Sequence, residues 1–221
     1  MELDETIRNR FSARAFLNQP VARSVIEEIL ALAVRSPSWG NTQPWEIGVV
    51  SGESAKNLAA RFVANITSGI QTRPDFPMPD KFVEPFMTRY RAVGRVVFAK
   101  KGIGREDQQA RVDHYLQNVS GFGAPTLLYL MVDQGLATVY PVFDAGLLAA
   151  HICLLATSRG LGTCLLAALS LYPDEVRNTL GVGPEKKIVL GLALGHPDLE
   201  APVNGIKTER EPLGQNVSWA E

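Results

Sequence analysis

This sequence of 221 residues has few cysteines and almost no net charge. It contains two cysteines, Cys153 and Cys164, too few for a disulfide framework. Its 22 basic and 23 acidic residues give a net charge of −1, which argues against a nucleic-acid binder, because neutralising phosphates requires a clustered positive excess. The hydrophobic content of 46% argues against intrinsic disorder. We therefore expect a globular, reduced, cytoplasmic protein.

The sequence also lacks an evident targeting or membrane-spanning segment. The first residues, MELDETIRNRF, are charged and have no apolar stretch typical of a signal peptide. The most apolar stretch, residues 145–157, is shorter than the roughly 20 residues that a membrane span requires. We expect a soluble protein, and the length favours one domain over residues 1–221.

The motifs of many enzymes are absent as well. There is no P-loop, no GxSxG and no GxGxxG, since GLGTCL and GIGRED lack the third glycine. The histidines, His114, His151 and His196, have no carboxylate or cysteine at metal-ligand spacing, so we predict no metal site. Nothing points to a Ser-His-Asp arrangement, although the sequence leaves one open. An enzyme of this sequence would depend on a bound cofactor for the difficult chemistry.

Helices and strands alternate along the chain. Helices are predicted at the start of the chain, over residues 24–35, 54–67, 86–101, 142–158 and 172–180, and in part of 102–117. Strands are predicted over residues 46–51, 124–132 and 188–194. This mixture indicates an α/β or α+β domain.

The predicted helix over residues 142–158 is apolar on nearly all sides. Inside it, Asp144 and His151 are the polar exceptions. A helix without a polar face has no side for solvent. It should lie in the middle of the domain or in a subunit interface, and we interpret His151 as a core or interface residue.

Arginine and serine alternate in the segment RFSARAF. If the segment is extended, Arg10, Ser12 and Arg14 point to one side. Two guanidiniums and a hydroxyl can clamp a phosphate or a carboxylate-like edge; the alternative is a solvated basic helix end. Lys207 and Arg210 form a second basic pair near the end of the chain, although a charged tail is usually a solvated face.

Two further segments are rich in amide or small side chains. In the loop SPSWGNTQPW, the amides of Asn41 and Gln43 commonly bond local backbone, while Trp39 and Trp45 would either wall a planar ligand or seal the core. The small residues of GLGTCLLAALS would either let the backbone approach a ligand closely or allow a helix to pack tightly on a strand.

In their order along the chain, these four segments resemble the nitroreductase family of FMN-dependent flavoproteins. RFSARAF is similar to the family's RxSxRxF motif, SPSWGNTQPW to its SPSxxNxQPW motif, and KTEREPLG to its phosphate-binding tail. GLGTC, YPDEVRNTLGV and IVLGLALGHPD resemble its carboxy-terminal half, and the proline-rich middle with KGIGREDQQAR looks like the nitrobenzoate reductase subgroup. The resemblance implies an α+β fold, with a mostly antiparallel central sheet surrounded by helices, in an interlocked homodimer that holds FMN at its interface.

The resemblance also implies which residues contact FMN. Arg10, Ser12 and Arg14 would contact the phosphate, the ribityl chain and the pyrimidine edge, and Asn118 would bond the flavin dione. The backbone amides of Ala167 and Ala168 would meet flavin N5 and O4. The whole set is Arg10, Phe11, Ser12, Arg14, Pro37, Ser38, Asn41, Gln43, Asn118, Ala167, Ala168, Lys207 and Arg210, of which Pro37, Ser38, Asn41 and Gln43 would come from the partner chain or line the flavin from its other side.

The activity implied is reduction of an electron-poor acceptor by NAD(P)H. Hydride would pass to flavin N5, the nucleotide would leave, and a nitroaromatic such as a nitrobenzoate, a quinone or an activated alkene would take the same place. This ping-pong cycle requires no catalytic side chain. The alternatives are an ene-reductase or another flavin reductase, an FMN-binding protein without turnover, and a flavin-free protein whose motifs are coincidental.

Aromatic residues around the proline-rich segment suggest a substrate pocket. The predicted pocket residues are Trp39, Phe76, Phe82, Phe86 and Tyr90. Residues 72–117 would form an insertion or lid over the active site. The alternative for residues 72–90 is a surface arm packed by its own aromatic side chains.

Overall fold

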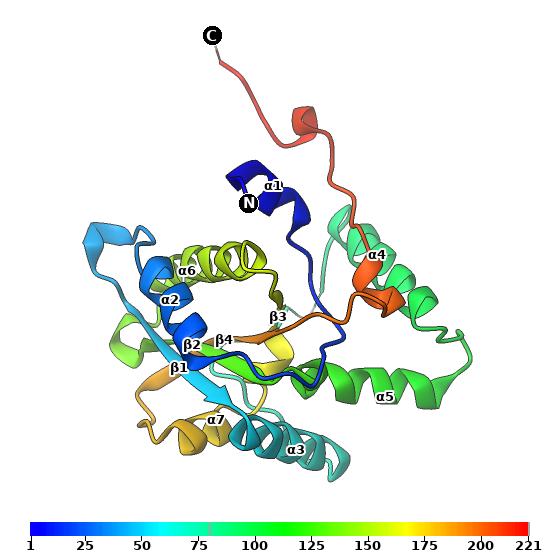
Figure 1. Cartoon of the computed structure of the whole chain (residues 1–221), viewed down its shortest axis with the longest axis horizontal. Helices are drawn as coiled ribbons and strands as arrows, with labels where there is room; N and C mark the ends of the chain where they lie inside the picture. Colours follow the sequence, from blue (N-terminus) through cyan, green and yellow to red (C-terminus); the bar gives the residue numbers. More distant parts are fainter. Residues whose placement is uncertain (80, 221) are drawn as a thin grey trace.

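The computed structural model describes residues 1–79 and 81–220 (Figure 1). The helices are α1 (Leu3–Asn9), α2 (Arg23–Ala33), α3 (Glu53–Thr67), α4 (Phe86–Lys100), α5 (Gln108–Val119), α6 (Val139–Thr157) and α7 (Pro173–Leu180). The strands are β1 (Trp45–Ser51), β2 (Thr126–Asp133), β3 (Gly162–Leu166) and β4 (Lys186–Gly195). They form one sheet of order β1-β2-β4-β3, in which every neighbouring pair is antiparallel. The α+β fold is therefore confirmed, and the predicted elements lie within a few residues of the observed ones.

Helices cover both faces of the sheet. In Figure 1, α2 and α6 lie on one side of it, and α3 and α7 lie on the other. The central strand β2 sends alternate side chains to these two layers. Leu128 packs in the cluster with α2 and α6, and its neighbour Tyr129 packs in the cluster with α3 and α7. A strand covered on both faces has no solvent side, which explains the continuous apolar run.

The strand β3 is not among the predicted elements, although it positions the amino-terminal segment. Ser12 bridges to Thr163 of β3, and the N–H of Ala13 donates to the Thr163 carbonyl at 2.9 Å. Glycine is required at Gly162, because a Cβ there would come within 2.8 Å of the Ala13 Cβ. The segment RFSARAF therefore follows an extended course, as the clamp interpretation required, and is fixed against the edge of the sheet.

The apolar helix α6 begins at Val139, earlier than predicted, and buries only one face. Leu148 and Ile152 pack with α2 and the sheet. On the opposite face, the side chains of Tyr140 and Phe143 are exposed. The helix is longer than the apolar stretch over residues 145–157. Its length and composition alone would allow it to cross a membrane. In this fold its inner face is part of the core.

A buried ion pair connects the proline-rich segment to α7. Asp75 and Arg177 of α7 are 8% and 9% exposed, and their charged groups lie 2.7 Å apart. Asp75 also accepts a hydrogen bond from the N–H of Ile188 in β4, at 2.8 Å. Buried charges are stable only when they are paired in this way. The chain around Asp75 is thus fixed against α7 and β4.

The helices α4 and α5 form a flank beside the sheet (Figure 1). The carboxy-terminal segment runs along α4: Val97 packs with Val203 and Ile206, and Arg89 pairs with Glu211 at 2.7 Å. Beyond these contacts the tail extends away from the body (Figure 1). The opening helix α1 is confirmed.

Candidate functional site

A large cavity lies between the α4–α5 flank and the edge strand β3. Its volume is about 1430 Å³, and its walls come from α4, α5, the amino-terminal segment and residues 164–168. Small-molecule sites usually measure about 300–1,000 Å³. This cavity therefore has room for a cofactor and a second ligand.

Several of the predicted site residues line this cavity. They are Arg14, Tyr90, Asn118, Ala167 and Ala168. Phe82 is outside the lining but stacks on Tyr90, with ring centroids 5.2 Å apart. Phe86 and Phe76 are also outside it, and Phe86 lies beneath the guanidinium of Arg89. Of the predicted aromatic pocket, only Tyr90 reaches the cavity directly in this chain.

Two buried polar atoms on α5 have no hydrogen-bond partner in the described part of the chain. They are Oδ1 of Asn118 and Nδ1 of His114. The two residues are four apart, so they share one face of the helix, and both line the cavity. Leaving a buried polar group unsatisfied costs about 1–3 kcal/mol. Both atoms indicate a ligand that completes their hydrogen bonding.

Positive charge gathers around this part of the cavity. Burial lowers the pKa of His114, and the charges of Lys101 and Arg14 lower that pKa further. Burial also lowers the pKa of Lys101, again with a contribution from Arg14. Lys101 hydrogen-bonds Gln117 and lies 5.4 Å from the centre of the Phe122 ring. An anionic ligand would be attracted here, and negative charge developing on it would be stabilised.

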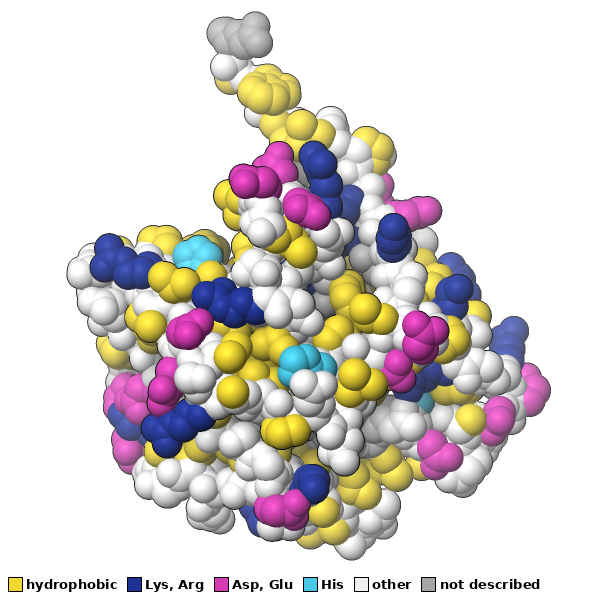
Figure 2. Space-filling view, viewed as in Figure 1, with side chains coloured by type: hydrophobic (Ala, Val, Ile, Leu, Met, Phe, Trp, Pro, Cys, Tyr) yellow, Lys and Arg dark blue, Asp and Glu magenta, His cyan; other side chains and the backbone are white. Residues whose placement is uncertain are grey.

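The charge of the lining is strongly one-sided. Six arginines line the cavity: Arg14, Arg89, Arg91, Arg95, Arg105 and Arg111. No carboxylate among the described residues joins them. Figure 2 shows Lys and Arg side chains along the flank over α4 and the loop to α5, with acidic side chains between them on the outer surface. The positive charge of its lining therefore favours an anionic ligand in the cavity.

Arg10, Phe11 and Ser12 lie beside the cavity without lining it. Burial raises the pKa of the Cys164 thiol to about 11, opposed by the charges of Arg14 and Arg10 and by a hydrogen bond with Ser12. Arg14 and Cys164 both line the cavity, and Arg10 is near enough for its charge to act on the thiol. The thiol stays protonated at neutral pH, so it is not a nucleophile.

The two cysteines pack on opposite faces of the sheet. Cys164 belongs to the cluster with α3 and α7, and Cys153 belongs to the cluster with α2 and α6. Both are free thiols. The structure therefore agrees with the expectation that disulfides do not hold this fold.

The loop SPSWGNTQPW lies outside the large cavity and beside α6. Pro37, Ser38 and Trp39 line a smaller cavity of about 480 Å³ together with Tyr140, Phe143, Asp144 and Leu147. Trp39 is 67% exposed and packs on Tyr140, with ring centroids 4.7 Å apart. Trp45, in contrast, is buried in the core, so it packs there and does not form the wall of a ligand site.

Asp144 holds this loop in place. It lies within the second turn of α6, 3% exposed, and its Oδ2 accepts the N–H of Trp39 at 3.1 Å. Asn41 and Gln43 have φ angles of +56° and +48°, in the left-handed region that is strained for most side chains. Such strain costs about 1–3 kcal/mol per residue and often marks ligand-contacting loops.

The basic pair near the end of the chain is also outside the large cavity. Lys207 and Arg210 are exposed, and Arg210 hydrogen-bonds Thr208 rather than any residue of the cavity wall. Within one chain, the predicted phosphate contacts of this segment are therefore not assembled with Arg14.

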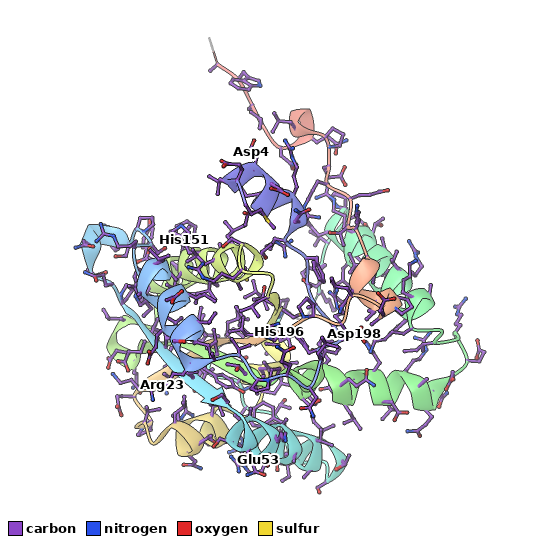
Figure 3. All side chains as sticks on the ribbon, viewed as in Figure 1. Asp4, Arg23, Glu53, His151, His196 and Asp198 are labelled. Atoms are coloured by element: carbon purple, nitrogen blue, oxygen red, sulfur yellow. The ribbon has the colours of Figure 1, made fainter. Side chains whose placement is uncertain are left out.

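The histidines do not converge. Figure 3 shows His151 on α6, apart from His196, which follows β4. His114 lies on α5 in the cavity wall. Within residues 1–79 and 81–220, no three His, Cys, Asp or Glu residues are grouped as metal ligands would be.

Several cavity residues were not predicted from the sequence. His114 and Phe98 face the cavity with their rings in an edge-on contact, at a centroid distance of 5.3 Å. Arg91 and Arg95 line it from α4. Their spacing of four residues inside a predicted helix was the available signal, since it places both on one face.

Comparisons with known proteins agree on one family. The model of the nitroreductase family matches residues 7–196 of this chain. A 4-nitrobenzoate reductase of Nocardioides sp. (strain LMS-CY) is 30% identical over 220 residues, which cover 98% of this chain and 89% of that protein.

Solved structures show the same likeness. The FMN and NADPH-dependent nitroreductase NfnB of Sphigopyxis sp. strain HMH matches with a TM-score of 0.95 and 33% identity, over 100% of both chains. The FMN-dependent nitroreductase NfnB of Mycobacterium smegmatis, solved in complex with NADPH, matches with a TM-score of 0.93 and 29% identity, over 99% of this chain and 97% of that one.

Proposed function

Because this chain belongs to the nitroreductase family, we propose that it is an FMN-dependent oxidoreductase that uses NAD(P)H to reduce nitroaromatic compounds. The observation that carries the proposal is the unpartnered Oδ1 of Asn118 in a cavity lined by arginines and by no described carboxylate. A ring N–H of a flavin would satisfy that oxygen, and a phosphate would meet the cations. The residues present therefore fit FMN.

We assign the cofactor contacts to the cavity floor and its edge. Arg14 and its neighbours Arg10 and Ser12 would bind polar oxygens of FMN, with Phe11 between them, and Asn118 would bind the pyrimidine edge. The backbone of Ala167 and Ala168, at the end of β3, would lie against the ring system. Lys207 and Arg210 would reach the phosphate only if the exposed segment that carries them turns toward the cavity.

Held by these residues, FMN would supply hydride-transfer chemistry for a ping-pong cycle in which NAD(P)H and the acceptor use the same place in turn. The chain contributes binding, orientation and charge. Arg14 and Lys101 would supply positive potential to a developing negative charge, and burial lowers the pKa of His114, which favours its neutral form. Phe98 and Tyr90 line the cavity and would pack against a bound aromatic ligand. No side chain is required as a catalytic acid or base, since solvent can supply protons.

We further propose a homodimer formed through the outer face of α6. Tyr140 and Phe143 are 55% and 60% exposed, and with Trp39 they form an aromatic surface around the smaller cavity. Monomeric proteins rarely expose a large apolar patch without a partner. A second chain on this surface would bring the loop with Pro37, Ser38, Asn41 and Gln43 toward its partner's flavin.

The substrate class proposed is a nitroaromatic acid such as 4-nitrobenzoate, with quinones as further acceptors. The support is the name of the Nocardioides relative and the positive charge of the cavity wall. Residues 72–117 would form the outer wall of the substrate site, with Tyr90 and α4 as its inner surface.

Initial-rate kinetics of the FMN-loaded protein test this function. We expect NADPH-dependent reduction of 4-nitrobenzoate, with parallel double-reciprocal lines when both substrates are varied. Intersecting lines would contradict the ping-pong cycle. Full flavin loading without NADPH oxidation would indicate an FMN-binding protein without turnover, and faster reduction of an enone would indicate an ene-reductase.

A further inference from the structure

The arginines of α4 exceed the cationic contacts already assigned to FMN. Arg91 and Arg95 are four residues apart on one face of α4, so their side chains are neighbours, and both line the cavity. Arg105, in the loop between α4 and α5, lines the same cavity. The three guanidiniums belong to a different wall from that of Arg14.

The other arginines of the cavity are already engaged. Arg89 pairs with Glu211 at 2.7 Å. Arg111 lies 4.7 Å from the centre of the Phe98 ring and donates to the carbonyl of Gly104 at 3.3 Å. These contacts fix both side chains within the protein itself.

Arg91, Arg95 and Arg105 have no such contacts. Within residues 1–79 and 81–220, none of the three makes an ion pair or a side-chain hydrogen bond. Like charges on one wall repel each other, and no described carboxylate in the lining offsets them. The net charge of the chain is only −1, so this concentration is local and does not reflect a basic protein.

We propose that Arg91 and Arg95, with Arg105, form a subsite for the anionic group of a ligand that binds over the flavin. A guanidinium matches a carboxylate or a phosphate through two parallel hydrogen bonds, and two neighbouring arginines can hold one such group between them. The anion has two sources with the same chemistry: the carboxylate of an aromatic acceptor and the 2′-phosphate of NADPH. This inference rests on the proposed function.

The test compares the double variant Arg91→Gln/Arg95→Gln with Lys100→Gln. Lys100 is exposed on the same helix but outside the cavity, so its variant removes a charge from α4 without touching the subsite. Each FMN-loaded protein is assayed with two pairs of ligands that differ in one anionic group: 4-nitrobenzoate against 4-nitrobenzamide, and NADPH against NADH. Binding of the unreactive pair benzoate and benzamide is followed through the flavin absorption.

For the double variant, we expect kcat/KM to fall about tenfold with the member of a pair that carries the additional carboxylate or 2′-phosphate, and to stay unchanged with the member that lacks it. Loss confined to 4-nitrobenzoate, with weaker benzoate binding, assigns the subsite to the acceptor. Loss confined to NADPH assigns it to the donor. Lys100→Gln should behave as the unmodified protein.

Two results would overturn the subsite. The first is equal behaviour of the double variant and Lys100→Gln with every ligand. The second is a loss of FMN affinity in the double variant, which would assign these arginines to the cofactor phosphate. Failure of the proposed function is distinguishable, because the unmodified protein would then reduce neither the charged nor the neutral acceptor.

Discussion

The two cavities of this chain differ in nearly every property that decides what they bind. The larger one is lined by six arginines and has polar atoms on α5 that lack partners among the described residues. The smaller one is lined mainly by aromatic and aliphatic side chains, and its carboxylate, Asp144, is satisfied by the backbone of Trp39. The larger cavity therefore contains polar atoms without a hydrogen-bond partner among the described residues. The smaller cavity instead presents apolar side chains that a second apolar surface could cover.

This difference separates two kinds of recognition. Unsatisfied polar atoms and concentrated charge are costly unless a polar, anionic ligand completes them. Exposed aromatic rings are best covered by another apolar surface, such as that of a second chain. The motifs RFSARAF and SPSWGNTQPW belong to different cavities in one chain, which is why both would serve one flavin only if two chains meet.

The largest effect should come from charging the smaller cavity. Phe143→Asp places a carboxylate on the proposed dimer surface, and we expect the dimer to weaken by about 2 kcal/mol or more, with loss of FMN. Sedimentation and the flavin-to-protein ratio measure both. Leu199→Asp is the control, since Leu199 is equally apolar and 73% exposed but lies outside both cavities. If the Phe143→Asp protein remained dimeric, that result would contradict the proposed interface.

An intermediate effect should come from the larger cavity. Arg14→Ala removes charge-assisted hydrogen bonds worth about 1.5–3 kcal/mol, so FMN should dissociate about 10-fold to 150-fold more readily. Titration of the apoprotein with FMN gives the dissociation constant. Arg73→Ala is the matched control, because Arg73 is exposed and outside the cavity. Equal FMN affinity in both variants would show that Arg14 does not hold the cofactor.

The smallest effect should be a change in the pH dependence of stability. Burial lowers the pKa of His114 in the folded protein, and Lys101 and Arg14 lower it further. As the pH falls below about 6.5, the unfolded imidazole takes up a proton that the folded one does not, so stability present above that pH is lost on acidification. Denaturant unfolding of the apoprotein between pH 5 and 8 should show a weaker loss for His114→Gln. An unchanged pH profile, with His196→Gln as control, would contradict the lowered pKa of His114.

Most of the fold could be predicted because its elements have strong local patterns. The continuous apolar run of β2 and the helical spacing of α2 and α3 gave those elements within a few residues. The strand β3 could not be predicted, because its sequence GTCLL is short, follows a glycine-rich stop and leads directly into further small residues. Its identity depends on pairing with β4 and on the contact of Gly162 with Ala13, both of which join residues distant in sequence.

The candidate site was predictable only in part. Asn118, Ala167 and Ala168 came from the family resemblance, Arg14 came also from the alternation of arginine and serine, and Tyr90 came from the aromatic residues around the proline-rich segment; all five line the cavity. The arginines of α4 had the right spacing, but spacing alone does not show which face of a helix meets a cavity. The cavity assignment of His114 likewise depends on how α5 packs, and no local pattern in the sequence gives that packing.

The most direct measurement is the visible absorption spectrum of the purified protein during anaerobic titration with NADPH. We expect the bands of oxidised flavin, their loss on addition of NADPH, and their return on addition of 4-nitrobenzoate. A colourless protein that takes up no added FMN would contradict an FMN site in the arginine-lined cavity.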